Sequence, residues 1–346
     1  MQELPRLLIT LGDVAGIGPE VLLKTWVQPS FFTQSQPVVV GDLRWIKKLA
    51  HQTGYTGEIY ETYLDAWPVA SPERMPVLQG TCTTLQNVVL GKPQADAGQA
   101  AYDFLTTAIK WTLQGKADAI VTLPLHKEGL HLAGHQYPGH TEILASACGI
   151  KKYAMMLYAP VVQNEGRTTG GLGVAHVTLH QSMQSIFTCI TTEAIIDKIE
   201  LTHEVMWRLL SKKPRIAVCA LNPHASDGGL FGNEEAAIIE PAVQHARQRG
   251  IDATGPWPAD TLFRQARSGL YDGIVAMYHD QGHIALKLIS GFHLVNITLG
   301  LPIVRTSVAH GTAYDIAHRF TADPYSLIYA CDVACKLVQS RNRKNP

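Results

Sequence analysis

The chain has 346 residues, which is long enough for two domains or for one large domain. Hydrophobic residues make up 46% of the sequence and charged residues 17%, so we expect a sizeable packed core and exclude a disordered chain. The formal net charge is zero, which argues against a general binder of nucleic acid or of anionic membranes. A local basic pocket for a single phosphate remains compatible with this balance.

Targeting signals and cysteine spacing indicate a cytoplasmic protein. Residues 1–6 carry no charged segment followed by an apolar stretch, so we predict no signal peptide. No apolar run approaches the roughly 20 residues that a membrane span requires. The six cysteines are scattered and none forms a CxxC pair, so we expect reduced thiols.

Short apolar runs alternate with helical patterns along the whole chain. We expect strands at 7–11, 37–40, 119–122, 153–158, 172–175, 215–220, 273–278 and 295–298. We expect helices at 97–114, 192–210, 234–249, 261–267 and 326–339. This alternation predicts an α/β fold with a largely parallel sheet. No Gly/Ser linker marks a boundary, so two domains, if present, share the sheet and are crossed by the chain more than once.

The expected helix 234–249 has clear end signals. Asn233 is a candidate N-cap, and Gly250 lies just past the end. Pro241 stands inside the helix and lacks the amide hydrogen that a helix interior needs. We therefore expect Pro241 to kink the helix or to split it in two.

Polar side chains follow the apolar run Ile274–Met277. His279 comes almost directly after this run, and Lys287, Asn296 and Arg305 each lie near a later apolar segment. A core strand gains nothing by ending in such a cluster. Side chains that receive a metal, a phosphate or a proton are typically placed where strand ends open into loops. The segment therefore predicts a functional site.

Three histidines, His176, His224 and His279, occupy equivalent positions after predicted strands. Three imidazoles at three strand ends can converge on one divalent metal and leave a position open for substrate. Their separations in sequence are long, so each can also be a hydrogen-bonded loop or core histidine. Asp260 can orient a ligand or carry a proton, and it can also be the N-cap of the expected helix 261–267.

Two histidine pairs stand four residues apart, His131 with His135 and His176 with His180. Helical pairs at this spacing can bind zinc, but the HExxH pattern is absent. We interpret both pairings as structural, apart from the separate role of His176.

The glycine-rich stretch Gly12–Glu20 follows an expected strand and opens a helix. Its placement suits an anion near a helix N-terminus. Its spacing matches neither GxGxxG nor GxxxxGK[ST], and a tight strand-to-helix turn explains it equally well.

A second helix start lies at 138–142. Thr141 or His140 can cap this helix while offering hydrogen-bond donors to a ligand. Lys287 would add a point charge, Asn296 a neutral donor and Arg305 a planar fork of donors. This combination predicts a phosphate pocket, and a solvated surface is the alternative for each basic residue taken singly.

Seven blocks together carry a family resemblance. They are TLGDVAGIGPE at 10–20, HKEGLHLAGHQYPGHTEILA at 126–145, AHVTLHQS at 175–182, LNPHASDGGLFGNEE at 221–235, GPWPADTLF at 255–263, MYHDQGHIALK at 277–287 and NITLGLPIVRTSVAHGTAYDIA at 296–317. They run in order through nearly the whole chain, and several are long and unusual. The chain thereby resembles the 4-hydroxythreonine-4-phosphate dehydrogenase (PdxA-type) family.

The resemblance implies an isocitrate/isopropylmalate dehydrogenase-like α/β fold with two domains and a mostly parallel sheet. We place one domain in residues 1–135 plus 280–346 and the second, which contributes to dimerisation and metal binding, in residues 136–279. A homodimer is implied, with the active site in the interdomain cleft at the dimer interface. The family binds NAD without a Rossmann fingerprint, and NADP is an alternative.

The resemblance also implies roles for individual residues. A divalent metal (zinc, magnesium, cobalt or manganese) is held by His176, His224 and His279, one of them from the partner chain. The positions that match the family's substrate-binding residues are His140, Thr141, Lys287, Asn296 and Arg305. Asp260 matches the active-site aspartate.

The implied reaction begins with hydride transfer to NAD from the carbon that bears the substrate's 3-hydroxyl. The metal lowers the pKa of that hydroxyl, and Lys287 or Asp260 accepts the proton. Decarboxylation of the resulting β-keto acid follows. Lys287 can instead serve only the phosphate.

Three enzyme interpretations stand inside the family. The first is oxidation of 4-phosphooxy-L-threonine to 3-amino-2-oxopropyl phosphate in vitamin B6 biosynthesis. The second is a D-threonate or D-erythronate 4-phosphate dehydrogenase. The third, the cis-dihydrodiol dehydrogenase branch, needs no phosphate-binding set, although that set is present here. Outside the family stand a sugar-acid sensor that has lost NAD binding and a metallohydrolase that needs no NAD.

Overall fold

The computed structural model describes residues 3–164, 167–291 and 293–341. The chain forms two compact units, which we call unit 1 and unit 2. Unit 1 comprises Met1–Ile150 with Leu301–Gln339, and unit 2 comprises Lys151–Gly300 with the chain from Ser340 onward. The division is discontinuous, as the sequence indicated, but it falls after residues 150 and 300 and not after the predicted residues 135 and 279.

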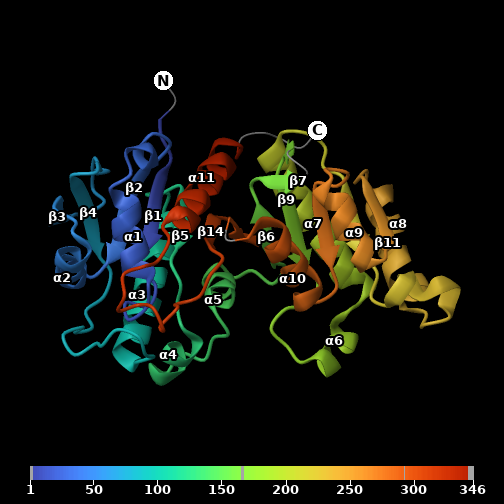
Figure 1. Cartoon of the computed structure of the whole chain (residues 1–346), viewed down its shortest axis with the longest axis horizontal. Helices are drawn as coiled ribbons and strands as arrows, with labels where there is room; N and C mark the ends of the chain where they lie inside the picture. Colours follow the sequence, from blue (N-terminus) through green and yellow to red (C-terminus); the bar gives the residue numbers. More distant parts are fainter. Residues whose placement is uncertain (1–2, 165–166, 292, 342–346) are drawn as a thin grey trace. The chain divides into compact units, whose positions relative to one another are not determined.

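The strands of unit 1 lie in the order β14-β5-β1-β2-β4-β3. Their bounds are β1 Arg6–Thr10, β2 Gln36–Gly41, β3 Glu58–Glu61, β4 Arg74–Gln79, β5 Ala119–Thr122 and β14 Val304–Val308. Neighbouring strands in this series pair in parallel, so their carboxyl ends share one edge. Figure 1 shows β1, β2, β4 and β3 side by side in blue. The loops that follow β1, β5 and β14 therefore meet at this edge.

The helices of unit 1 form two packed groups. The bounds are α1 Gly18–Trp26, η1 Pro29–Phe32, α2 Leu43–Thr53, α3 Ala95–Leu113, α4 Lys127–Leu132, α5 His140–Ala147 and α11 Tyr325–Gln339. Helix α1 packs against α2 and α11, and α3 packs against α4 and α5. Because α5 packs on α3, residues 140–147 belong to unit 1, which moves the domain boundary beyond the predicted one. Gly98 and Gly129 allow α3 and α4 to approach closely, since a Cβ on Gly98 would overlap the Gly129 backbone.

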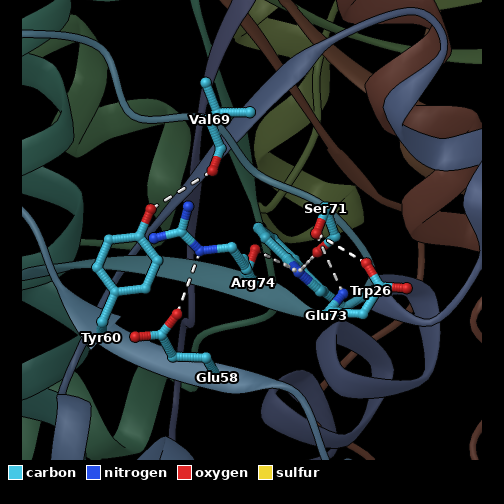
Figure 2. A network of polar contacts seen from close by, with 7 residues as sticks. All are labelled: Trp26, Glu58, Tyr60, Val69, Ser71, Glu73 and Arg74. Atoms are coloured by element: carbon cyan, nitrogen blue, oxygen red, sulfur yellow. Dashed lines mark hydrogen bonds and ion pairs between the residues drawn. The ribbon is translucent and has the colours of Figure 1, made fainter.

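A polar network fixes the β3–β4 end of this sheet to α1 (Figure 2). The indole Nε1 of Trp26 donates to the backbone oxygens of Ser71 and Arg74, at 2.9 and 3.4 Å. The Arg74 guanidinium donates to Glu58 at 3.1 Å and lies over the Tyr60 ring, 5.1 Å from its centroid. These contacts link β3 and β4 to each other and to α1, so we assign the side chains a structural role in unit 1 and not a role in a ligand site.

The strands of unit 2 lie in the order β11-β10-β12-β9-β6-β13. Their bounds are β6 Ala154–Ala159, β9 Leu172–His176, β10 Ile216–Cys219, β11 Ala253–Trp257, β12 Gly273–Ala276 and β13 Val295–Leu299. Strand β6 runs antiparallel to β9 and β13, and the pairings among β9, β10, β11 and β12 are parallel. A short hairpin of β7 Val162–Asn164 and β8 Arg167–Thr169 follows β6. The predicted mixed α/β fold with a mostly parallel sheet is confirmed.

Helices pack against the sheet of unit 2. The bounds are α6 Met183–Cys189, α7 Thr192–Leu210, η2 Pro223–Gly229, η3 Glu235–Ile239, α8 Glu240–Gln248, α9 Ala259–Arg267 and α10 His279–Ser290. Helix α10 contacts β9, β12 and β6, so residues 280–290 belong to unit 2, against the domain prediction. The expected helix 234–249 is split, because η3 is a π-helical segment and Pro241 lies in the first turn of α8. Asn233 is not the side-chain cap that we predicted.

The six cysteines are free thiols, and three of them are buried. Among the described residues, no helix is both long and apolar enough to cross a membrane.

Candidate functional site

Unit 2 brings several histidines together at the carboxyl ends of β9 and β12. His176 is the last residue of β9 and is only 1% exposed, and His279 is the first residue of α10. Their ring centroids are 6.4 Å apart. His283, one turn further along α10, places its Nδ1 3.1 Å from His176 Nε2 and stacks on His279 with centroids 3.8 Å apart. His180 lies 5.9 Å from His279. His283 was not among the predicted residues, and its spacing of four residues from His279 on α10 is the signal that could have found it. The spacing of His180 from His176 was noted in the sequence but interpreted as structural.

Gln281 holds the start of α10 in place. Its side-chain oxygen accepts from the backbone amide of Met277 at 2.7 Å, and its side-chain nitrogen donates to the backbone oxygen of Ala220 at 2.8 Å. Gly282 faces His176, and a Cβ there would overlap the imidazole. In the sequence His-Asp-Gln-Gly-His, Gln281 and Gly282 thus place the first histidine at the strand ends, where its Nδ1 lies 2.6 Å from Asp280 Oδ1.

Burial favours the neutral form of two of these imidazoles, His176 and His283. It lowers the pKa of His176 well below its ordinary value, and the neighbouring His283 and His279 lower it further. Burial, His279 and Lys287 lower the pKa of His283 to about 4. Neutral imidazoles keep the lone pairs that a divalent metal requires. The donor chemistry of the cluster therefore fits a metal such as zinc or cobalt.

His224 reaches its position through an unusual backbone. Four consecutive non-glycine residues, His224 to Asp227, have φ between 45° and 66°. This left-handed region costs about 1–2 kcal/mol for each such residue. The His224 ring lies 6.3 Å from that of Phe231. Within residues 3–164, 167–291 and 293–341, no three His, Cys, Asp or Glu side chains are grouped closely enough to hold a metal ion. The structure thus brings His176 and His279 together without His224.

The three remaining predicted residues of unit 2 lie on different elements. Asp260 is exposed in the first turn of α9, and the N-cap is Pro258, so our capping prediction for Asp260 is wrong. Lys287 is exposed in the last turn of α10. Asn296 lies on β13 opposite Leu157 of β6, and its buried Oδ1 accepts no hydrogen bond from a described residue. A buried amide oxygen of this kind is suited to a donor on a ligand.

Unit 1 places a buried cation at the β5–β14 edge. Arg305 lies on β14 and is 2% exposed. Its Nη2 donates to the Thr122 hydroxyl, at the end of β5, at 2.6 Å. Burial lowers the pKa of Arg305 to about 9, and Glu142 acts in the opposite direction. The guanidinium therefore remains charged near neutral pH, and a buried charge favours an anion beside it.

His140 and Thr141 open helix α5 in the same unit. The N-cap is Gly139 without a side-chain hydrogen bond, so neither residue is the cap that we predicted. Desolvation and then the charge of Arg305 lower the pKa of His140 well below its ordinary value. Thr141 is 9% exposed. A neutral imidazole, a hydroxyl and the amides of a helix start are all donors for an anionic ligand.

The glycine-rich turn contains a buried acid that our sequence reasoning missed. Asp13 is 0% exposed, and it accepts from the Ala15 amide at 2.9 Å and from the Tyr314 hydroxyl at 2.7 Å. Burial raises the pKa of Asp13 above its ordinary value. The first residues of α1, Gly18 to Glu20, are themselves buried. These features favour the tight-turn interpretation of this stretch over the anion site.

Comparisons with known proteins show the family to which this chain belongs. Residues 33–334 match the family model described as "Pyridoxal phosphate biosynthetic protein PdxA". The chain is 41% identical to a 4-hydroxythreonine-4-phosphate dehydrogenase of Geobacter metallireducens, with 97% of this chain and 96% of the relative covered. It is also 41% identical to a D-threonate 4-phosphate dehydrogenase of Cupriavidus necator, with 98% of each covered.

Among solved structures, a 4-hydroxythreonine-4-phosphate dehydrogenase from Klebsiella pneumoniae matches with a TM-score of 0.83 and 38% identity, covering 97% of this chain and 98% of that one. The fold and these relatives define an oxidoreductase of the dehydrogenase class. The chain belongs to the PdxA family, and the predicted resemblance is confirmed.

Proposed function

We propose that this chain oxidises the 3-hydroxyl of 4-phosphooxy-L-threonine with NAD and a divalent metal, and then decarboxylates the product to 3-amino-2-oxopropyl phosphate. The observation that carries the proposal is the buried Arg305 with its Thr122 hydrogen bond and its neutral neighbour His140. A permanently charged planar fork among neutral donors is suited to a phosphate monoester. Such a set has no purpose in an enzyme for unphosphorylated dihydrodiols.

The phosphate-binding residues would act by fixing the substrate in one orientation. Arg305 supplies parallel N–H donors, while His140 and Thr141 supply neutral ones. Lys287 adds a point charge and Asn296 an amide in the proposed pocket. Positioning of this kind brings the carbon that loses the hydride into a reactive geometry without an entropic cost at the moment of reaction.

His176, His224 and His279 are the proposed metal ligands. His176 and His279 lie together in one chain and His224 does not join them, which is the arrangement expected if one copy contributes His224 to the site of the other. We infer a homodimer in which residues of unit 2 complete the site. When bound, the metal lowers the pKa of the substrate hydroxyl and polarises the adjacent carbonyl.

Asp260 and Lys287 are the candidates for moving the proton of the 3-hydroxyl. Both are exposed on α9 and α10, so each can exchange protons with water. Lys287 follows His283 by four residues on α10, and its charge lowers the pKa of His283, which supports a role for Lys287 near the histidines. We assign the hydride acceptor as NAD, with NADP as the alternative.

A second candidate substrate is D-threonate or D-erythronate 4-phosphate. The relatives favour neither assignment, since proteins of both names are 41% identical to this chain. The experiment that tests the proposal measures reduced nicotinamide formation with each of the three phosphates and added zinc, magnesium or manganese. Preference for the amino acid phosphate supports the first function, and preference for a sugar acid phosphate supports the second. Silence with all three contradicts both and revives the cis-dihydrodiol branch.

A further inference from the structure

The segment that carries His224 adopts a conformation that its own sequence does not favour. His224, Ala225, Ser226 and Asp227 are left-handed with φ of 54°, 53°, 66° and 45°, and Gly228 follows with φ of 71°. Side chains with a Cβ avoid this region, and only isolated residues visit it routinely. Interactions outside the segment must therefore hold it.

One carboxylate, that of Glu235, supplies several of these interactions. Its Oε1 accepts from the backbone amides of Leu221 at 2.8 Å and of Asn222 at 2.7 Å. Its Oε2 accepts from the side-chain amide of Asn222 at 3.0 Å and from the hydroxyl of Ser226. Both oxygens are thus used, and the contacts span the chain from just before His224 to just after it.

The environment of Glu235 suits a charged acceptor. The residue is 4% exposed and opens the π-helical segment η3. Burial raises the pKa of Glu235, but the hydrogen bonds from Asn222 and Ser226 outweigh it, so the pKa lies below its ordinary value. A buried carboxylate is retained only when its oxygens are satisfied by donors, and here Leu221, Asn222 and Ser226, on either side of His224, supply four of them.

The same strand end also holds the start of α10. Ala220, next to Leu221, accepts from Gln281 at 2.8 Å, and Gln281 lies two residues after His279. Glu235 and Gln281 therefore fix adjacent residues at the end of β10, one toward His224 and the other toward His279. The positions of the two histidines in unit 2 share one anchoring point.

We propose that Glu235 is a positioning residue: it holds Leu221, Asn222 and Ser226, keeps the residues from His224 onward in the left-handed conformation, and thereby presents His224 to the metal. This inference rests on the metal-ligand role of His224 in the proposed function. It adds to that function a residue that touches neither substrate nor metal. Partners that orient a metal ligand typically change metal affinity by about 10- to 100-fold when they are removed.

The test is a titration of the metal-free full-length protein with Co²⁺, followed by its visible absorption. Glu235→Gln keeps the size of the side chain but replaces one hydrogen-bond acceptor, a carboxylate oxygen, with an amide group that donates. We expect Co²⁺ affinity to fall about 10- to 100-fold. The matched control is Glu234→Gln, which removes the same charge from the neighbouring residue. Among the described residues, the Glu234 side chain accepts from Asn222 Nδ2 alone, at 2.7 Å. We expect this control to keep most of the affinity.

Ser226→Ala is a second, milder variant that keeps the inference testable if Glu235→Gln does not fold. It removes one of the four contacts and leaves the carboxylate in place, so we expect a smaller loss of affinity than in Glu235→Gln. The thermal unfolding midpoint is measured for each variant. If Glu235→Gln and Ser226→Ala lower the midpoint and leave Co²⁺ affinity unchanged, Glu235 only stabilises the fold and the inference is overturned.

His224→Ala separates the inference from the proposed function. Loss of Co²⁺ binding in His224→Ala with full binding in Glu235→Gln overturns the clamp alone. Equal binding in the unaltered protein and in His224→Ala removes His224 from the metal site, which overturns both the assignment and the clamp. Loss in both variants, with retention in Glu234→Gln, supports the inference.

Discussion

Burial lowers the pKa of a side chain in each of the two strand-end clusters, but it leaves the two side chains with different charges. At the β5–β14 edge of unit 1, burial lowers the pKa of Arg305 to about 9, which leaves the side chain charged near neutral pH. At the β9–β12 edge of unit 2, burial lowers the pKa of His283 to about 4, which leaves it neutral. Similar desolvation therefore yields a cation in one cluster and free lone pairs in the other.

This difference shows that the residue type, and not the topology, decides what each edge can bind. Both edges are formed by the carboxyl ends of parallel strands. A guanidinium starts from so high a pKa that burial cannot neutralise it at physiological pH, and it attracts anions. An imidazole starts near neutrality, so burial converts it into a metal ligand.

Removing a ligand from the histidine cluster should have the largest effect. In His279→Ala the proposed metal site loses a donor from the start of α10, and we expect turnover to fall to background and Co²⁺ binding to be lost. The readouts are Co²⁺ absorption and reduced nicotinamide formation. His131→Ala is the control, because His131 lies on helix α4 of unit 1. Equal loss in the control, or full activity of His279→Ala after chelation, would contradict the metal assignment.

Removing the buried cation should affect substrate binding more than the fold. Arg305→Met keeps much of the side-chain volume and deletes the charge. Loss of charge-assisted contacts to a phosphate is expected to cost about 1.5–3 kcal/mol, so KM for the phosphorylated substrate should rise roughly 10- to 150-fold. The measurement is kcat and KM by steady-state kinetics.

Arg44→Met is the matched control for Arg305, since Arg44 is an exposed arginine of α2 in the same unit. We expect its KM to equal that of the unaltered enzyme. An unchanged KM in Arg305→Met would remove Arg305 from the phosphate pocket. It would also contradict the view that the β5–β14 edge binds an anion through a buried cation.

Two buried aspartates sharpen the comparison through their pH dependence. In unit 2, Asp272 is buried, and hydrogen bonds from Arg215 and Lys212 outweigh that burial, so its pKa lies below the ordinary value. In unit 1, burial raises the pKa of Asp13 above the ordinary value. Asp272 thus contributes stability above about pH 4 that is lost as the pH falls through its folded pKa, whereas the contribution of Asp13 is lost as the pH rises.

Asp272→Asn should therefore destabilise the protein by about 1.5–3 kcal/mol near neutral pH, because hydrogen bonds to a charged acceptor are lost. The difference from the unaltered protein should shrink as the pH falls from about 4 through the lowered folded pKa of Asp272, because both proteins carry a neutral side chain below that pKa. Urea unfolding at several pH values measures this difference. Asp13→Asn is the counterpart, and its difference should change in the opposite direction. Parallel pH curves for the two variants would contradict the assigned shifts.

The sequence predicted the core of the fold because apolar runs and end signals are local. The strand Ala119–Thr122 and the helix Thr192–Leu210 match the observed β5 and α7. The edge strand β3 and its neighbour β4 were missed, since glutamates at both ends of β3 and a proline inside β4 weaken the strand pattern.

The sequence predicted which residues belong to the candidate site, but it did not predict the contacts that hold them in place. The blocks around His279 and Arg305 carried a clear signal in the sequence. The clamp of Glu235 on the His224 segment did not, because it depends on a left-handed backbone that none of those residues favours. The pairing of Asp13 with Tyr314 joins positions about 300 residues apart in the chain, which no local pattern reports.

The smallest expected effect comes from the hydroxyl that holds Arg305. Thr122→Val keeps the shape of the side chain and removes the acceptor that lies 2.6 Å from Arg305 Nη2. Because the guanidinium and its charge remain, only its orientation is weakened, and we expect KM to rise about 3- to 10-fold, which corresponds to roughly 1 kcal/mol. kcat should be unaltered, and Thr122→Ser should restore the original KM. A fall in kcat with constant KM would place Thr122 in the chemical step and would show that the cationic edge does more than hold a phosphate.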